Sequence, residues 1–392
     1  MVLRMNVCIF GNYYPHFEGS GTITSALSLL LAEDPRFRSI TIHGNSDSVI
    51  PPVISPERVR LERSWTRDDP VSIIRAIIHM LFRSKTDLYI FNIYLTCFGR
   101  GRLTNFIGLL MPAIVSLVSR KKVITYMHNF LETQQIDKLG YKATLPTKII
   151  VHIVEKVIAA FTTLVTTLPS MAREMERVLR RPVSYALIPY ADATVSYLTN
   201  REKIIETLSK ARTEPNILLF GSWGPQKDVI GLLEHLNSMV SNLESQLNFT
   251  VAGSINKNFP SYISLVTRCV SKLNSKRFRF MLDPSDDELP FIFLNADAII
   301  LPYFTSGGAS GVLQLASFYF LDIFAYEVSE LRELAQMINQ KVTFIQPGDR
   351  IALSNILSNV RVRKGLTIDK FDEKVKRSHA AIDRLLQSID NE

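Results

Sequence analysis

The sequence predicts an α/β protein made of two doubly wound domains, each with a parallel sheet that helices cover on both faces. Its 392 residues are too many for one ordinary hydrophobic core and fit two domains of roughly 150–200 residues each. Short apolar, β-branched runs alternate with longer helical patterns, as in sheets whose parallel strands are joined by helices. The alternation stops in a polar stretch near the middle of the chain and then starts again, which predicts a domain boundary there.

The first half of the chain carries six candidate strands and at least two long helical patterns. Residues 5–10 are a short apolar run followed directly by Gly11 and Asn12, so they predict a buried strand rather than a signal peptide. Helices are predicted at residues 22–32 and 147–160. The other candidate strands are residues 39–43, 87–91, 123–128, 164–167 and 183–188.

Residues 191–212 are predicted to be a hinge between an N-terminal domain (residues 1–190) and a C-terminal domain (residues 213–365). In the second domain, strands are predicted at residues 217–220, 249–252, 278–281 and 298–301, and helices at 229–239, 262–273 and 289–294. Apolar residues then recur at helical spacing from Phe371 to Ile389. Residues 366–392 are therefore predicted to form an amphipathic helix that packs back on the first domain.

The charge balance and the cysteines narrow the class of protein. Lys and Arg number 45 against 37 Asp and Glu, a net charge of +8 that suits a polyanionic partner, although solubility alone explains it equally well. The basic residues are scattered and not interleaved with aromatic ones, so a nucleic-acid partner is not expected. Cys8, Cys97 and Cys269 form neither a disulfide framework nor a metal motif, which predicts a reducing, cytoplasmic location.

Two segments of the first domain are both apolar and basic. Residues 103–118 are the longest apolar stretch, but about 16 residues fall short of the roughly 20 that span a bilayer. Arg120, Lys121 and Lys122 follow this stretch, and residues 73–83 have a similar composition. The simplest interpretation is a pair of core helices. The alternative is that they rest on an anionic membrane, which would make the protein peripheral on its cytoplasmic face.

Three loops are candidate binding sites, because ligands of doubly wound sheets bind at the carboxyl ends of the strands. Residues 11–21 contain Gly19 and Gly21 just before a helix, where a glycine lets a ligand approach the backbone and a helix N-terminus favours an anion. Residues 220–228 contain Gly221, Ser222 and Lys227, whose ammonium group could meet a phosphate. An ordinary solvated loop is the alternative in both cases.

The third loop is rich in glycine and serine and leads into an apolar helix. Ser310, Gly311 and Val312 begin that helix, so their amides and the serine hydroxyl would face an anion such as a phosphate. No Lys-Ser/Thr pair follows, so the spacing is not that of a Walker A loop. A flexible turn is the alternative.

Taken together, the second and third of these loops resemble the corresponding loops of the family-4-like glycosyltransferases (glycosyl transferases group 1), here in a divergent form. Gly221 and Lys227 match the family's Gly-Arg loop with a lysine several residues on, while Ser222 stands where the arginine is usual. Residues 295–302 resemble the family's strand that ends in proline, and residues 310–316 its Gly-rich turn and helix. The resemblance runs through nearly the whole chain and is strongest between residues 217 and 334. It implies the GT-B fold, in which two Rossmann-like domains face a cleft.

The resemblance also implies roles for single residues. His128 matches the first-domain histidine beside the sugar pocket, and Glu333 matches the acid that ends residues 328–334. The family has two glutamates separated by seven residues around the Gly-rich turn, and Ser306 and Gln314 stand in their places. Gln314 can still hydrogen-bond a ribose hydroxyl, whereas Ser306 cannot supply the missing charge.

These roles divide the candidates into two groups. The catalytic candidates are His128, Lys227 and Ser306. The donor-binding candidates are Gly19, Gly21, Gly221, Ser222, Lys227, Ser310, Gly311, Val312, Gln314 and Glu333.

The function that the resemblance implies is transfer of a hexose from a nucleotide-sugar donor, UDP- or GDP-linked, to a lipid-linked or glycan acceptor, with retention. Asp286 and Asp287 are adjacent rather than spaced as Asp-x-Asp, so no metal site and no cofactor are expected. Lys227 and the amides of residues 310–312 would then neutralise the leaving diphosphate. The replaced glutamates leave two alternatives open: a catalytically silent protein that binds a nucleotide sugar or a partner, and a sugar-nucleotide epimerase or hydrolase.

Overall fold

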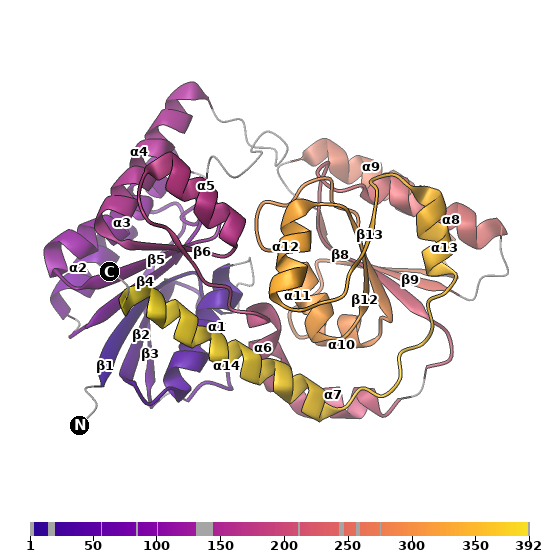
Figure 1. Cartoon of the computed structure of the whole chain (residues 1–392), viewed down its shortest axis with the longest axis horizontal. Coiled ribbons are helices and arrows are strands. Elements are labelled where there is room, and N and C mark those ends of the chain that lie inside the picture. The colour runs from indigo at the N-terminus through magenta and orange to yellow at the C-terminus, as the bar shows by residue number, and fades with distance from the viewer. Residues whose placement is uncertain are drawn as a thin grey trace. The chain divides into compact units, whose positions relative to one another are not determined.

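The computed structural model describes residues 4–14, 20–55, 57–83, 85–99, 101–130, 144–210, 212–242, 247–255, 259–274 and 276–390. The chain divides into two compact units, each with its own parallel sheet (Figure 1). Unit 1 contains the described residues between 4 and 130 and between 144 and 199, together with residues 375–390, and unit 2 contains residues 200–374. The first division falls between Thr199 and Asn200, inside the stretch that the sequence predicts as a hinge.

Unit 1 is built on a seven-stranded sheet in the order β3-β2-β1-β4-β5-β6-β7, and its neighbouring strands all pair in parallel. Because the strand order runs outward from β1 in both directions, the connecting helices fall on both faces. The strands are β1 (Met5–Gly11), β2 (Phe37–Asn45), β3 (Val59–Trp65), β4 (Leu88–Ile93), β5 (Lys122–Met127), β6 (Thr163–Thr166) and β7 (Ser184–Tyr185). The helices are α1 (Ser20–Glu33), α2 (Pro70–Arg83), α3 (Arg102–Ser119), α4 (Leu145–Phe161), α5 (Pro169–Leu179) and α6 (Ala191–Thr199).

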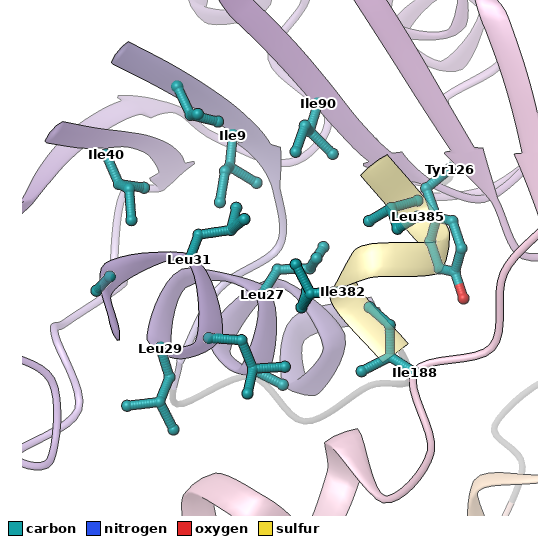
Figure 2. Close-up of a cluster of buried hydrophobic side chains, with 14 of the residues drawn as sticks. Ile9, Leu27, Leu29, Leu31, Ile40, Ile90, Tyr126, Ile188, Ile382 and Leu385 are labelled. Atoms are coloured by element: carbon teal, nitrogen blue, oxygen red, sulfur yellow. The ribbon is translucent and has the colours of Figure 1, made fainter. Parts of the chain in front are cut away.

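One face of this sheet packs against α1, α6 and the second half of α14 (Ile368–Asp390). Figure 2 shows Ile382 and Leu385 of α14 beside Leu27 of α1 and Tyr126 of β5, in a cluster that also takes in the β1 and β4 side chains. Leu385 is fully buried and Ile382 is 3% exposed. The predicted return of the C-terminal helix to the first domain is therefore confirmed.

Helices α2, α3 and α4 lie side by side, α2 against α3 and α3 against α4 (Figure 1). Helix α3 turns Leu109, Met111 and Val115 inward. It approaches the loop after β4 closely at Gly108, where a Cβ atom would lie 2.4 Å from the ring of Phe98. Glycine is required there because any side chain would displace that buried ring.

Unit 2 is built on a six-stranded sheet in the order β10-β9-β8-β11-β12-β13, again with parallel pairing throughout. Its strands are β8 (Asn216–Trp223), β9 (Asn248–Ile255), β10 (Phe278–Leu282), β11 (Ala298–Leu301), β12 (Asp322–Tyr326) and β13 (Thr343–Ile345). Its helices are α7 (Arg201–Leu208), α8 (Val229–Asn242), α9 (Pro260–Val270), α10 (Leu289–Leu294), α11 (Gly311–Phe318), α12 (Ser329–Met337) and α13 (Arg350–Leu357). The first turns of α14 also belong here, since the ring of Phe371 packs 5.6 Å from Phe318 and 5.2 Å from Phe320.

The amino edge of the unit 2 sheet is closed by a buried ionic group. Asp297, with no exposed surface, accepts hydrogen bonds from Arg212 Nη2 (2.6 Å), from the Asn216 amide (2.8 Å) and from the Arg363 amide (2.7 Å). A buried carboxylate needs such partners to offset the loss of its hydration. Groups of the protein itself therefore satisfy the Asp297 carboxylate at this edge.

The structure differs from the sequence prediction at several elements. Strand β3, absent from the prediction, pairs with β2 at the edge of the sheet and carries Arg60 and Glu62, which form an ion pair at 2.6 Å. Charged side chains are common on edge strands, which have one unpaired side, and they hide the apolar pattern. Strands β12 and β13 are also absent from the prediction. Residues 191–199 of the predicted hinge form α6, whose Ala191 and Val195 lie in the core of unit 1.

Candidate functional site

The carboxyl edge of the unit 2 sheet brings β8 and β9 together at two glycines. Gly221 of β8 pairs with Gly253 of β9, and both have positive φ angles, +136° and +139°. A Cβ atom on Gly253 would lie 2.1 Å from the Gly221 carbonyl oxygen. The sequence prediction places Gly221 and Ser222 in a loop, but β8 continues through both to Trp223, because its backbone keeps pairing with β9 as far as Ile255.

Lys227 folds back over the end of β8. Its backbone forms an isolated bridge with Tyr303, its amide donates to the Gly224 carbonyl at 2.9 Å, and its Nζ lies 4.4 Å from the centroid of the Tyr303 ring. The same Nζ lies 2.9 Å from the position of a Cβ atom on Gly221, and Val312 Cγ2 lies 3.6 Å from that position. Gly221 and Lys227 of one predicted loop and Val312 of another therefore meet at one point.

A polar cluster of Asp228, Tyr326 and Arg350 lies next to Lys227 and anchors its loop. The amide of Asp228 donates to the Pro302 carbonyl at 2.8 Å, and its Oδ2 accepts from Tyr326 Oη at 2.7 Å. Arg350 donates to Tyr326 Oη at 2.6 Å and forms an ion pair with Asp228. Burial and the bond to the Asp228 carboxylate raise the pKa of the Tyr326 phenol, so it stays protonated and donates.

Sequence reasoning missed this cluster, although one signal was present. Asp228 directly follows Lys227, and Tyr326 ends a strand at the same edge of the sheet. Asp228, Tyr326 and Arg350 lie far apart in the chain, so only the fold shows that they touch.

The start of α11 is shaped by two serines. Ser310 is the N-cap residue, and its Oγ accepts from the Leu313 amide at 3.3 Å. The Ser306 hydroxyl donates to the Gly308 carbonyl at 2.8 Å and so stabilises the turn before the helix, where Gly308 has a φ of +146°. The amides of Gly311 and Val312 lie in the first helical turn, where no carbonyl of the helix can accept from them, so they suit an anion.

Three other donor-binding candidates in unit 2 differ in how far their side chains are exposed to solvent. Ser222 is exposed at the end of β8, opposite Ser254 of β9. Gln314 is buried near the start of α11, and its backbone N–H donates to the Ser310 carbonyl at 3.3 Å. Glu333 is half-buried in the middle of α12. Gln314 follows Gly311 and Val312 along the same helix, whereas Glu333 lies on a different one.

Unit 1 presents a second polar cluster at the carboxyl edge of its own sheet. His128, just after β5, donates from Nε2 to Asn92 Oδ1 of β4 at 2.5 Å, and Asn92 Nδ2 donates to Thr24 Oγ1 of α1 at 2.7 Å. Gly11, which ends β1, pairs with Asn92, and a Cβ atom on it would lie 2.7 Å from the Asn92 carbonyl oxygen. Helix α1 and three neighbouring strands thus hold one histidine in place.

The chemistry of His128 follows from this packing. Its ring lies edge-on to the Tyr126 ring at 4.9 Å, and burial lowers the pKa of the imidazole to about 4. The ring is therefore neutral at pH 7. With Nε2–H committed to Asn92, Nδ1 carries the lone pair and can accept a hydrogen bond from a hydroxyl group. A neutral ring held in this way can accept a hydrogen bond from a hydroxyl group and is a weak proton donor at pH 7.

The first glycine loop is described only in part. Gly19 lies outside the described residues. Gly21 is buried in the first turn of α1, where its carbonyl accepts from Ser25 Oγ at 3.0 Å.

The charges around these sites come from side chains and helix ends. Among the residues that the structure describes, no group of three or more His, Cys, Asp or Glu side chains is arranged to hold a metal ion. At the carboxyl edge of the unit 2 sheet, the positive groups described above are the Lys227 ammonium and the amides of Gly311 and Val312 in the first turn of α11.

Comparison with known proteins gives a likeness in structure alone. No protein-family model matches the chain, and no curated protein matches it in sequence. Anabaena Alr3699/HepE in complex with UDP and glucose superimposes with a TM-score of 0.61 at 11% identity, over 99% of this chain and 98% of that one. Sucrose-phosphate synthase from Thermosynechococcus elongatus gives 0.62 at 12% identity, over 97% and 95%. The catalytic domain of starch synthase IV from Arabidopsis thaliana, bound to ADP and acarbose, gives 0.59 at 12% identity, over 99% of both chains.

These likenesses span both units and the C-terminal helix. Two parallel-sheet α/β units and a final helix that returns to the first unit make up the arrangement predicted from the sequence. The chain has the GT-B fold, which these solved glycosyltransferase structures share.

Proposed function

We propose that this protein is a glycosyltransferase that binds a nucleotide-sugar donor in unit 2 and transfers its hexose to an acceptor bound through unit 1. The observation that carries the proposal is the convergence of Lys227, Gly221 and the first turn of α11 at the carboxyl edge of the sheet. Doubly wound sheets bind their ligands at this edge. A lysine ammonium and free helix amides are groups that stabilise a diphosphate.

The roles of the remaining residues follow from their positions. The Lys227 ammonium and the amides of Gly311 and Val312 would neutralise the charge that develops on the leaving diphosphate. Gln314, one turn further along α11, would hold a ribose hydroxyl. In unit 1, Nδ1 of the neutral His128 would accept a hydrogen bond from a sugar hydroxyl.

The proposal includes a transfer that needs no divalent metal and that retains the configuration of the anomeric carbon. The donor base is proposed to be uracil or guanine. The UDP found in the HepE structure supports the first choice, while the ADP in starch synthase shows that the fold also takes other bases. The acceptor is proposed to be a lipid-linked sugar or another glycan.

Calorimetry with UDP, GDP and ADP, with and without Mg²⁺, tests the donor site first. We expect one nucleotide to bind selectively, with the same affinity in EDTA as in Mg²⁺. Absence of binding by all three would contradict the proposal. Binding that requires Mg²⁺ would contradict its metal-independent part.

One specific observation favours a second candidate, a catalytically silent protein that binds a nucleotide sugar. The Ser306 hydroxyl is engaged in the turn before α11, and Gln314 carries no charge, so neither places a carboxylate near the donor. Analysis of the products formed from the donor separates the possibilities. Transferred sugar supports the transferase, an intact donor supports the silent binder, and an altered or hydrolysed donor supports an epimerase or hydrolase.

A further inference from the structure

Helices α2, α3 and α4 expose an unusual share of the large apolar side chains of this protein. Of the twenty-two exposed large apolar side chains that the structure describes, fourteen lie on these three neighbouring helices. We call these fourteen residues the α2–α3–α4 face. They are Val71, Ile74, Ile78 and Phe82 of α2; Leu103, Phe106, Ile114, Leu117 and Val118 of α3; and Leu145, Ile149, Ile150, Ile153 and Phe161 of α4.

The spacing of these residues places them on the outer side of each helix. In α2 they recur three or four residues apart, so they form one stripe, and Phe82 at its end is 76% exposed. In α3 the opposite side carries Leu109, Met111 and Val115 into the core. In α4 the stripe runs from Leu145 to Phe161. Each helix is therefore apolar on two sides, one of which has no covering among the described residues.

The exposed charges of the three helices are all positive. Their only acidic residue is Glu155, which is 1% exposed and so adds no negative charge to the surface. Arg75, Arg102, Lys148 and Lys156 are all exposed. No ion pair within the described parts of the chain engages these four side chains.

An apolar surface of this extent, on three helices that carry exposed cations and no exposed acid of their own, has a specific complement. Single exposed apolar residues are ordinary on soluble proteins, but a contiguous group marks an interaction site. A second copy of the chain would set two positive faces against each other. An anionic bilayer offers acyl chains to the apolar residues and negative headgroups to the lysines and arginines.

Helix α3 is long and apolar enough to cross a membrane by length and composition alone. However, one of its sides packs in the core of unit 1, and its Gly108 fits closely to Phe98. A crossing helix would have to leave that core. The geometry is that of helices lying flat on a surface.

We propose that the α2–α3–α4 face binds the surface of an anionic lipid bilayer. The face lies on unit 1 and does not include any residue of the proposed donor site. The inference therefore holds or fails independently of the proposed function.

The test is flotation of the full chain with vesicles of phosphatidylcholine alone or mixed equally with phosphatidylglycerol, at low and high salt. One variant removes apolar residues, with Ile78→Ser, Leu117→Ser and Ile153→Ser combined. Its matched control makes the same change at three exposed positions of unit 2, with Ile205→Ser, Ile263→Ser and Leu265→Ser. A charge variant combines Arg75→Gln, Lys148→Gln and Lys156→Gln, and its control combines Lys210→Gln, Lys272→Gln and Lys276→Gln.

We expect the protein to float with the anionic vesicles at low salt and to lose most of that binding at high salt, because the headgroup attraction is screened. Both α2–α3–α4 variants should bind the anionic vesicles more weakly by a factor on the order of ten or more. Both controls should bind as the native chain does. No flotation with anionic vesicles, or equal flotation of variants and controls, would overturn the inference. So would a dimer in light scattering that the apolar variant abolishes without any vesicle binding.

Nucleotide calorimetry on the same variants keeps the two proposals apart. Loss of flotation with unchanged nucleotide affinity is the expected result. Flotation without nucleotide binding would contradict the proposed function and leave the membrane surface standing.

Discussion

The Nζ of Lys227 lies 2.9 Å from the position that a Cβ atom would occupy on Gly221. The glycine is thus required for two reasons, since its φ of +136° suits few other residues and its missing side chain leaves room for the ammonium group. The proposed donor site depends on Lys227, whose ammonium group lies over the backbone of Gly221 and beside the first turn of α11.

Gly221→Ala is expected to weaken nucleotide binding and to lower the free energy of unfolding by about 1–3 kcal/mol, because the backbone is strained and the Lys227 ammonium is displaced. The control is Gly365→Ala, which also has a positive φ (+72°) but no neighbouring atom within 4 Å. The control should share the loss of stability and keep the nucleotide affinity. Equal affinities for both variants would show that Gly221 matters only to the backbone.

Tyr326→Phe removes the hydroxyl that joins Asp228 to Arg350. We expect a loss of about 1–3 kcal/mol in unfolding free energy, because the half-buried Asp228 and Arg350 each lose a hydrogen bond, together with weaker nucleotide binding as the Lys227 loop loosens. Urea denaturation and calorimetry measure the two effects. Tyr185→Phe, at a 51% exposed position, is the control and should change neither. Full nucleotide affinity in Tyr326→Phe would show that the cluster does not position Lys227.

The free energy of unfolding should fall as the pH drops from about 6.5 towards 4. Burial lowers the pKa of His128 to about 4 and that of His43, which also faces His79 and Arg60, to about 3. In this window the unfolded chain takes up protons on these histidines and the folded chain does not, so acid favours unfolding by about 1.4 kcal/mol per pH unit for each group.

The measurement is the unfolding free energy of the native chain and of His128→Gln at several pH values. The glutamine amide can still donate to Asn92 but does not titrate. The variant should show a shallower dependence between pH 6.5 and 4. Identical slopes would mean that His128 is not held neutral by its surroundings.

Leu385→Ala tests the return of α14 to unit 1. Leu385 is fully buried beside Leu27 and Tyr126, so the cavity should cost about 2–5 kcal/mol in chemical denaturation (Figure 2). Ile351→Ala, at a side chain that is 76% exposed, should cost less than about 0.5 kcal/mol. Similar losses for both would contradict the packing of α14.

Much of the fold is predictable from the sequence because its parallel strands are short, apolar and separated by helices. The core strands β1 and β8 are recognisable for this reason. Strand β3 escapes prediction because Arg60 and Glu62 interrupt its apolar pattern at the sheet edge. The segment 191–199 is also misleading, because its mixture of polar and small residues conceals Ala191 and Val195, which pack into the core of unit 1.

The candidate site is predictable where its signal is local. Lys227 and the Gly-Ser segment before α11 are visible because both follow strands and precede helices. The cluster of Asp228, Tyr326 and Arg350 is invisible in the sequence, because its members come from three separate segments. The α2–α3–α4 face is predictable in part, since α2 and α3 are both apolar and basic, but only the fold shows that α4 extends it.

The most direct test of the donor site is the nucleotide affinity of Lys227→Ala, compared with Lys276→Ala, a variant of an exposed lysine elsewhere in unit 2. We predict that Lys227→Ala weakens binding of the preferred nucleotide by roughly 1–3 kcal/mol, as expected when a charge-assisted contact to the diphosphate is lost. Lys276→Ala should bind like the native chain. Unchanged affinity in a folded Lys227→Ala protein would contradict the assignment of the donor site to this edge of unit 2.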